Sequence, residues 1–299
     1  MDRVLARRIT ERGECMANIE HTSTPSGLYV VGQRPSFGPY LAEAWRRRGF
    51  AWQLASYRLV SGLLQNRLGI LWLVLKPLSM VIVYGSIFTF VLAGPARPAN
   101  FVPFLIVGVF TFEFFTGSFT SGARAITGNT KLVQSIGFPR ILLPVSVVIE
   151  QAMRMVPVVL LMYLLMIVLG EPVTWLWLLL IPILLIMGVF NLGVALIVAR
   201  LSTHARDVQQ IIPIINRVLF YGTGIFFSID GALAEYPVLL SIAHLLPTYE
   251  FVTMTRGALL ESVSVPDVVW IAAPIWALTT LVVGTIFFWR AEARYGLND

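Results

Sequence analysis

The stretch VTWLWLLLIPILLIMGVFNLGVALIVA, residues 173–199, decides the class of fold. It contains no charged residue. At a helical rise of about 1.5 Å per residue it is long enough to cross a hydrocarbon core about 30 Å thick. The rest of the chain agrees, since 57% of its 299 residues are apolar and only 13% are charged, about half the charged share of a typical soluble protein. We therefore expect an integral membrane protein.

Six apolar stretches reach the length of about 20 residues that a membrane helix needs. They cover residues 70–94, 101–121, 141–169, 173–199, 208–229 and 268–289. Two shorter apolar pieces, 238–246 and 251–260, predict re-entrant or interfacial outer helices in the region of about 231–262. The expected fold is an all-α membrane protein whose residues 69–299 form a six-span domain.

The distribution of basic residues predicts the topology. Most of the 22 Lys and Arg residues lie before the first span, between spans two and three, between spans four and five, or after the last span. The connections on the other side hold only Arg97 and Arg256. Because cytoplasmic loops are enriched in Lys and Arg, we expect a multi-pass protein of the cytoplasmic (inner) membrane with both termini in the cytoplasm.

Two regions precede the first span. Residues 1–40 are polar and mixed, which is typical of a poorly ordered cytoplasmic segment. Residues 41–68 instead place apolar side chains on one helical face and basic ones beside them, which favours an amphipathic helix in the cytoplasmic membrane interface. Its interfacial residues are Trp45, Arg46, Arg47, Arg48 and Trp52. The alternative is a basic flank that only sets the topology.

A basic, half-apolar segment, GNTKLVQSIGFPRILLPV, joins the second and third spans. Leu132, Val133 and Ile136 form an apolar stripe that suits docking into a groove on a soluble partner. Pro139 is expected to end this short helix, with Arg140 at the membrane boundary. The alternative is an interfacial connector with no partner.

Four charged residues fall within the predicted spans, where charge is costly unless it is paired or hydrated. They are Glu113, Glu150, Arg154 and Arg217. One hypothesis is a structural ion network between spans two, three and five, and the other is a polar pathway. Lys76 lies near the start of span one and is expected to extend to the cytoplasmic surface.

Aromatic residues are frequent in spans two and five. Packing and contact with lipid explain most of them, but aromatic rings also suit the passage of sugars, because they stack on C–H faces. The candidates for a sugar path are Phe112, Phe115, Tyr221 and Phe226.

Several kinds of chemistry lack their motifs. The sequence has no G-x-x-x-x-G-K-[ST] loop for ATP, no H-E-x-x-H metal motif and no G-x-S-x-G elbow. Its single cysteine and three scattered histidines favour neither a disulfide nor a metal site. We expect a transport subunit rather than an enzyme, with no cofactor of its own and no nucleic-acid partner.

Four segments together resemble the permease subunit of ABC-2 type polysaccharide exporters, the group that moves O-antigen, teichoic acid and galactan chains. The segments are RLGILWLVLKPL (67–78), NTKLVQSIGFPRILLP (129–144), ARDVQQIIPIINRVLFYGTGIFFSID (205–230) and HLLPTYEFVTMTRGALL (244–260). Among these exporters, the actinobacterial galactan permeases look similar. The Leu246-Pro247 pair departs from the Asn-Pro that the family often has there.

The resemblance implies a homodimer of six-span subunits that works with two copies of a separate cytoplasmic ATPase carrying ATP and Mg²⁺. It implies a lipid-linked polysaccharide as cargo. It also implies that the ATPase couples to the connections 2–3 and 4–5, through Asn129, Lys131, Leu132, Phe138, Pro139, Arg140, Arg206 and Asp207. The alternatives are an ABC-2 permease for a lipid, drug or haem, and a secondary transporter driven by protons through Glu113 and Glu150.

Overall fold

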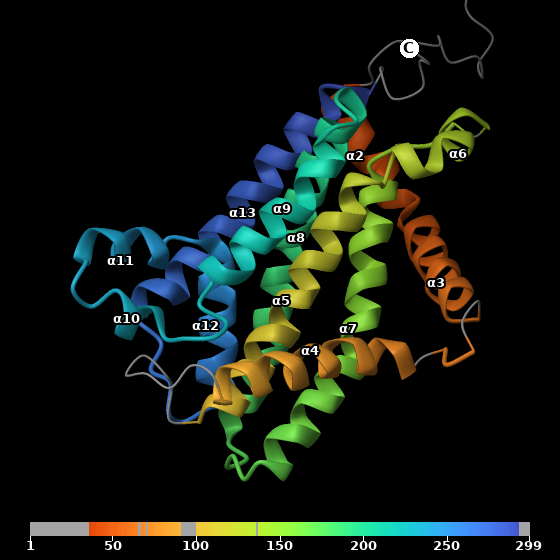
Figure 1. The fold of residues 1–299 in the computed structure, drawn as a ribbon. Coiled ribbons are helices and arrows are strands. Elements are labelled where there is room, and N and C mark those ends of the chain that lie inside the picture. The colour runs from red at the N-terminus through yellow and green to blue at the C-terminus, as the bar shows by residue number, and fades with distance from the viewer. Residues whose placement is uncertain (1–35, 65–66, 70, 91–99, 136, 293–299) are drawn as a thin grey trace, which may run out of the picture. The chain divides into compact units, whose positions relative to one another are not determined.

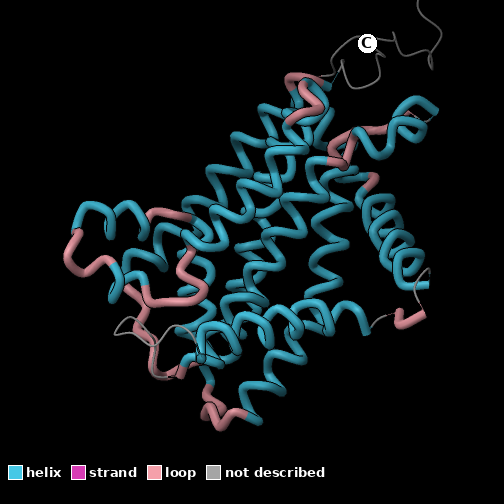
Figure 2. Tube along the Cα trace, in the orientation of Figure 1, coloured by secondary structure: helices cyan, strands magenta, loops and turns pink. Residues whose placement is uncertain are grey.

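The computed structural model describes residues 36–64, 67–69, 71–90, 100–135 and 137–292. Figure 2 shows these parts of the chain as helices joined by short loops. In chain order (Figure 1) the helices are α2 Phe37–Arg46, α3 Arg48–Leu64, α4 Leu71–Phe90, α5 Phe101–Ala123, η1 Thr127–Asn129, α6 Thr130–Ser135, α7 Leu142–Val168, η2 Trp175–Leu179, α8 Leu180–His204, α9 Val208–Gly222, α10 Ile229–Ala232, α11 Pro237–His244, α12 Pro247–Leu259 and α13 Asp267–Trp289.

Four helical segments of the described chain are long and apolar enough to cross a membrane. They are Phe101–Ala123, Leu142–Val168, Trp175–His204 and Asp267–Trp289. The pair α11 and α12 adds a fifth if the two helices, bent by 81° against each other, form one broken span. The predicted all-α membrane fold is confirmed, whereas the count of six spans is not reproduced.

Two predicted spans differ from the structure. The first, 70–94, lies partly outside the described residues. Its described part, α4, has an apolar stretch of only Leu71–Ile87 and runs across α5 and α7 in Figure 1. The fifth, 208–229, ends early, because α9 stops at Gly222 and the chain turns at Gly224, whose φ is +68°. Only glycine adopts such a φ at little cost. The helix therefore ends before this turn, although the sequence stays apolar beyond it.

The connection between α9 and α13 holds the expected short helices. Both α11 and α12 begin with a proline in the first turn, where its missing N–H costs nothing. They match the apolar pieces 238–246 and 251–260. Nearly every side chain of α12 is buried, so this helix is part of the core of the domain.

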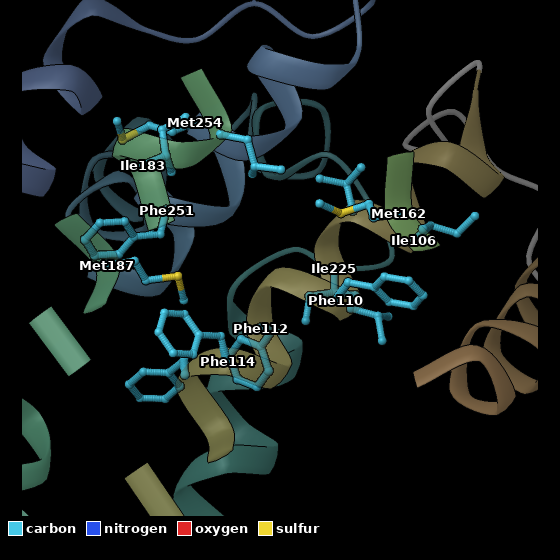
Figure 3. Close-up of a cluster of buried hydrophobic side chains, with 14 of the residues drawn as sticks. Ile106, Phe110, Phe112, Phe114, Met162, Ile183, Met187, Ile225, Phe251 and Met254 are labelled. Atoms are coloured by element: carbon cyan, nitrogen blue, oxygen red, sulfur yellow. The ribbon is translucent and has the colours of Figure 1, made fainter. Parts of the chain in front are cut away.

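The centre of the domain is α5, which is buried over most of its length. Figure 3 shows Phe110, Phe112 and Phe114 of this helix together with Met162 of α7, Met187 of α8 and Phe251 of α12. The flexible methionine side chains fill the gaps that rigid rings leave. This packing holds α5 in place against its neighbours. It therefore also fixes the positions of the polar residues on α5.

A close backbone contact joins α8 and α13. A Cβ atom added at Gly193 would lie 2.3 Å from the backbone of Thr280, and one added at Gly284 would lie 2.4 Å from the Gly193 carbonyl oxygen. Small residues allow membrane helices to approach this closely. The contact places the C-terminal end of α13 beside the end of α8.

Several segments that the topology prediction placed in the cytoplasm lie at one end of the described domain. In Figure 1, α2, α6 and the C-terminal end of α13 gather at the top of the view, while α10, α11 and α12 lie away from them. The predicted disordered region 1–40 lies outside the described residues as far as residue 35. Its last residues, by contrast, begin α2, where Tyr40 is only 3% exposed.

Candidate functional site

The connection between spans two and three contains the expected short helix, as η1 followed by α6. Two residues of its apolar stripe, Leu132 and Val133, pack within the domain. Val133 is buried, and Leu132 packs half-buried in the same cluster with Ile126 and Ile141. The docking of this stripe on a soluble protein stays a prediction, since Leu132 is only half-buried and Ile136 is outside the described residues. The exposed side of α6 is polar, with Thr130 and Lys131.

The end of this connection is held by a buried carboxylate from the other end of the chain. Glu292, just beyond α13, accepts a hydrogen bond from the Arg140 backbone N–H at 3.0 Å and one from the Tyr40 hydroxyl at 2.8 Å. The Arg140 guanidinium donates to the Glu292 backbone oxygen, and the Tyr40 hydroxyl accepts from the Ile141 N–H at 3.2 Å. These hydrogen bonds join α2, the connection between α5 and α7, and the end of α13. We call the four residues that form them, Tyr40, Arg140, Ile141 and Glu292, the three-way tie.

The Glu292 side chain of the three-way tie is buried. Burial raises the pKa of the Glu292 carboxyl, and the hydrogen bonds from Arg140 and Tyr40, together with the charge of Arg140, only partly offset this effect. The group is therefore easier to protonate than an ordinary glutamate. Sequence reasoning missed it, because a lone acid after a span carries no signal of its own.

The helices α2 and α3 support the same connection along its length. Arg47 donates to the Gly137 carbonyl oxygen at 3.0 Å, and the rings of Phe50 and Phe138 lie 5.0 Å apart. Pro139, which follows Phe138 in the sequence, is buried. The predicted interface helix thus contacts the predicted coupling segment directly.

Arg58 of α3 joins the start of the connection to α7. It donates to Asn129 Oδ1 at 3.0 Å and to the Ser146 hydroxyl at 3.2 Å. Burial lowers the pKa of this guanidinium, and the charge of Glu150 counteracts the shift. The Asn129 side chain is therefore occupied within the domain.

The connection between spans four and five meets the same end of the domain. Gln209, in the first turn of α9, donates to the Thr127 hydroxyl of η1 at 2.9 Å. The preceding Arg206 and Asp207 are exposed. The structure thus brings the two predicted coupling connections into contact, with exposed charges beside the contact.

The predicted interface helix 41–68 is broken into α2 and α3 at Arg47. Trp45 and Trp52 are 70% and 58% exposed, as lipid-facing anchors would be. Arg48 lies over the Trp45 ring at 4.9 Å, and Arg46 pairs with Glu43 at 3.2 Å. The exposed rings leave the interfacial role an open prediction.

A cavity of about 550 Å³, lined by both charged and apolar side chains, lies between α4, α5 and α7. Its walls hold three of the four charged residues predicted within spans, and Lys76 with them. Lys76 pairs with Glu113, and Arg154 pairs with Glu150 at 2.7 Å. The Lys76 side chain is 58% exposed and Glu113 is half-buried, so the expected extension of Lys76 to the cytoplasmic surface stays a prediction. Instead of one network across three spans, two separate ion pairs face one cavity.

Arg217 stands apart from this cavity. It is exposed on α9, and no ion pair forms with it in the described part of the chain. Within the same residues, no group of three His, Cys, Asp or Glu side chains lies close enough to hold a metal ion. The expected link from span five to the other charges is absent among the described residues.

Neutral polar residues complete the walls of the cavity. They are Thr116, Thr120, Ser121 and Gln151. On α5, Thr116, Thr120 and Ser121 follow Glu113 by three, seven and eight residues, which places them on one helical face. This periodicity of polar residues inside a span was the sequence signal that could have located the cavity.

The aromatic candidates for a sugar path lie mostly in the core. Phe112, Phe115 and Phe226 are at most 4% exposed, and their rings contact other rings, such as Phe112 against Phe220 at 5.4 Å. Only Tyr221 is exposed. The three buried rings serve packing in this structure, and a part of theirs in transport stays a prediction.

Arg256 of α12 is a buried cation that the sequence did not single out. It donates to the carbonyl oxygens of Phe104, Gly224 and Ile225 at 3.0–3.3 Å and lies 3.3 Å from the Phe104 ring centre. It thereby fixes the turn after α9 to the start of α5. Glu250 of the same helix is also buried, and neither of its carboxylate oxygens has a hydrogen-bond partner within the described chain.

Comparisons with known proteins agree with the resemblance seen in the sequence. No protein-family model matches the chain. The O-antigen export system permease protein RfbA of Myxococcus xanthus is 28% identical over 253 residues, which cover 85% of this chain and 94% of that protein. Two permeases of the same name from Klebsiella pneumoniae are 28% identical over 169 and 166 residues, and the matched parts cover 63% and 62% of their lengths.

These relatives are named as permeases of an export system, which agrees with the expected transport subunit rather than an enzyme. The helices long enough to span a membrane point to the same class. The likeness extends over nearly the whole length of the Myxococcus protein. The chain is thus a multi-pass membrane protein similar to O-antigen export permeases, and the resemblance to a polysaccharide-export permease is confirmed.

Proposed function

We propose that this chain is the permease subunit of an ATP-driven exporter that carries a lipid-linked polysaccharide of the galactan or O-antigen kind across the inner membrane. Two copies would form a homodimer with both termini in the cytoplasm and would work with two copies of an ATPase that binds ATP and Mg²⁺. In this arrangement α4 and α9 supply the two remaining membrane segments. The names of the relatives support an exporter.

The observation that carries the proposal is the way the connection between α5 and α7 is built. A segment that receives force must transmit it, and this one is tied to three elements. Arg47, between α2 and α3, donates to the Gly137 carbonyl oxygen, the Glu292 carboxylate accepts from the Arg140 N–H, and Gln209 donates to Thr127. A push by the ATPase on the exposed polar side of α6 would therefore reach α3, α9 and α13 together.

Proton-driven transport through Glu113 and Glu150 is the alternative to this ATP-driven mechanism. Glu113 and Glu150, the acids that would carry protons, each form an ion pair, with Lys76 and with Arg154. Transport that continues without ATP and collapses with the proton gradient would contradict the proposal.

Depletion of the protein tests the cargo. We expect lipid-linked glycan to accumulate on the cytoplasmic side of the membrane when the chain is depleted, and to be exported again when the wild-type chain is restored. Accumulation of a lipid, drug or haem, with normal export of glycan, would instead assign a different cargo to the same type of permease.

A further inference from the structure

Three side chains on the short helices between α9 and α13 form a closed cluster. His244, in the last turn of α11, lies with its Nε2 atom 2.7 Å from the Asp230 carboxylate of α10. The Tyr249 hydroxyl of α12 donates to the other oxygen of that carboxylate at 3.3 Å. The His244 imidazole also stacks on the Tyr249 ring, with 5.2 Å between the ring centres. Each of the three residues therefore contacts the other two, and we call them the His244 cluster.

The helix α11 has few other attachments to the domain. Of its eight residues only Ala243 is buried, in a small apolar cluster with Ile229 and Tyr249. On its other side, Val238 and Leu239 are 72% and 51% exposed. In Figure 1, α11 lies at the edge of the described domain. A segment with few buried apolar contacts opens easily, so the His244 cluster has a large share in holding α11 in place.

The two partners of His244 sit on better fixed elements. Tyr249 is only 3% exposed, and its helix α12 is held by the three hydrogen bonds of Arg256 to backbone carbonyl oxygens. Asp230 follows the buried Ile229, and the Ser228 hydroxyl accepts a hydrogen bond from the Gly231 N–H at the start of α10. The part of this region that is free to move is therefore α11.

The strength of the His244 cluster depends on the charge of the imidazole. A carboxylate only accepts hydrogen bonds, so Nε2 carries a hydrogen in both the neutral and the charged form of His244. A second proton turns the bond to Asp230 into a charge-assisted ion pair and places a cation over the electron-rich face of the Tyr249 ring. The Asp230 side chain is 56% exposed and that of His244 is 28% exposed, so the pair exchanges protons with solvent.

The charged groups on the elements next to α11 are few. The helix α10 contributes Asp230, and α12 contributes Glu250, whose two carboxylate oxygens bond to no described residue. Arg256 of α12 is directed to carbonyl oxygens instead. Glu235, in the turn before α11, is exposed and forms no ion pair within the described ranges. Glu250 is therefore the group whose titration must be separated from that of His244.

We propose that the His244 cluster is a proton-operated latch, in which protonated His244 holds α11 against α10 and α12 and loss of the proton loosens α11. Histidine is the side chain whose charge changes between about pH 5 and pH 8. The attachment of α11 therefore responds to the pH of the compartment that this helix faces. This property goes beyond the proposed function and does not depend on it.

Electron paramagnetic resonance of the full-length chain in nanodiscs tests the latch. A spin label is attached at Leu239→Cys, on the exposed side of α11, after Cys15→Ser has removed the single native thiol. We expect the ratio of mobile to immobile label to rise about two- to fivefold between about pH 5 and pH 8, the range for an ion pair of partly exposed groups. His244→Gln should give the high-pH ratio throughout, and Asp230→Asn should also abolish the response to pH.

Two further variants separate the parts of the cluster. Tyr249→Phe keeps the stacked ring and loses the hydrogen bond to Asp230. It should make the label more mobile at every pH and leave the response to pH in place. Glu250→Gln removes the neighbouring acid without removing the histidine, so the response to pH should persist in this variant as well.

The matched control is His204→Gln, which removes an exposed histidine at the end of α8 and should leave the response unchanged. Size-exclusion profiles show which variants fold. Three results would overturn the inference: a wild-type label whose mobility does not change with pH, a response that persists in His244→Gln, or a response that vanishes in Glu250→Gln or His204→Gln. The assay contains neither ATPase nor glycan, so its outcome is independent of the proposed export.

Discussion

The Tyr40 hydroxyl donates a hydrogen bond to the Glu292 carboxylate at 2.8 Å, although 252 positions separate the two residues in the chain. This bond connects the first described helix with the end of the last. Because Arg140 also bonds to Glu292, the connection between α5 and α7 is fixed between the two ends of the described domain. We regard this three-way tie as the feature that makes the connection mechanically useful.

The hydroxyl of Tyr40 should contribute measurably to stability. It both donates to Glu292 and accepts from the Ile141 N–H, so Tyr40→Phe leaves two buried groups unsatisfied. The expected loss is about 1–3 kcal/mol, measured as unfolding of the detergent-solubilised protein. Tyr57→Phe is the matched control, because that ring is 71% exposed. Equal stability of the two variants would show that the tie contributes nothing.

Stability should depend on the protonation of Glu292. Burial raises its pKa above the ordinary value of 4.5, so the folded state binds the proton more tightly than the unfolded state. The contribution of Glu292 to stability is then greatest below pH 4.5 and is lost as the pH rises through the folded-state pKa. Thermal unfolding at a series of pH values should show this decline in the wild type and a flatter profile in Glu292→Gln. Identical profiles would contradict the prediction.

The close contact between α8 and α13 should not tolerate a side chain. Gly193→Ala places a methyl group against the backbone of Thr280 and Leu281, which cannot move aside as a flexible side chain would. We expect a loss of about 1–3 kcal/mol or more, and less of the variant in the membrane. Gly222→Ala is the control, since no atom lies within 4 Å of the added carbon. A stable Gly193→Ala variant would mean that the helices do not pack this closely.

The buried Arg256 should be indispensable to the turn after α9. Arg256→Met leaves three carbonyl oxygens without their donor, and we expect a loss of at least about 3 kcal/mol. The readout is the melting temperature together with the amount of folded protein in the membrane. Arg217→Met is the control on an exposed arginine and should change little. If both variants behave alike, Arg256 is not a structural residue.

The sequence predicted the elements that follow from apolar length and from local signals. The membrane class, the short helix after α5 and the two short helices near 238–260 all came from this reasoning. The early end of α9 could not be predicted in this way, because Ile225 and Phe226 keep the stretch apolar after the turn at Gly224. Tertiary packing, rather than hydropathy, decides where that helix ends.

Part of the candidate site could also be predicted from local sequence signals. Charged residues inside spans stand out in a sequence, and three of the four line one cavity. The pairing of Lys76 with Glu113 did not stand out, since the two residues come from different helices. The role of Glu292 depends on contacts with Tyr40 and Arg140, which only the folded chain brings together.

The most direct test of the central claim is the coupling of ATP hydrolysis to export in the complex of this chain with its ATPase. The change is replacement of Phe138, Pro139 and Arg140 by alanine, with Lys131→Ala as a variant of the exposed side of the same connection. We predict that the triple variant still inserts and binds the ATPase but loses export, with ATP hydrolysis no longer linked to it. If export and coupled hydrolysis both persist at the wild-type level, this connection is not the coupling element.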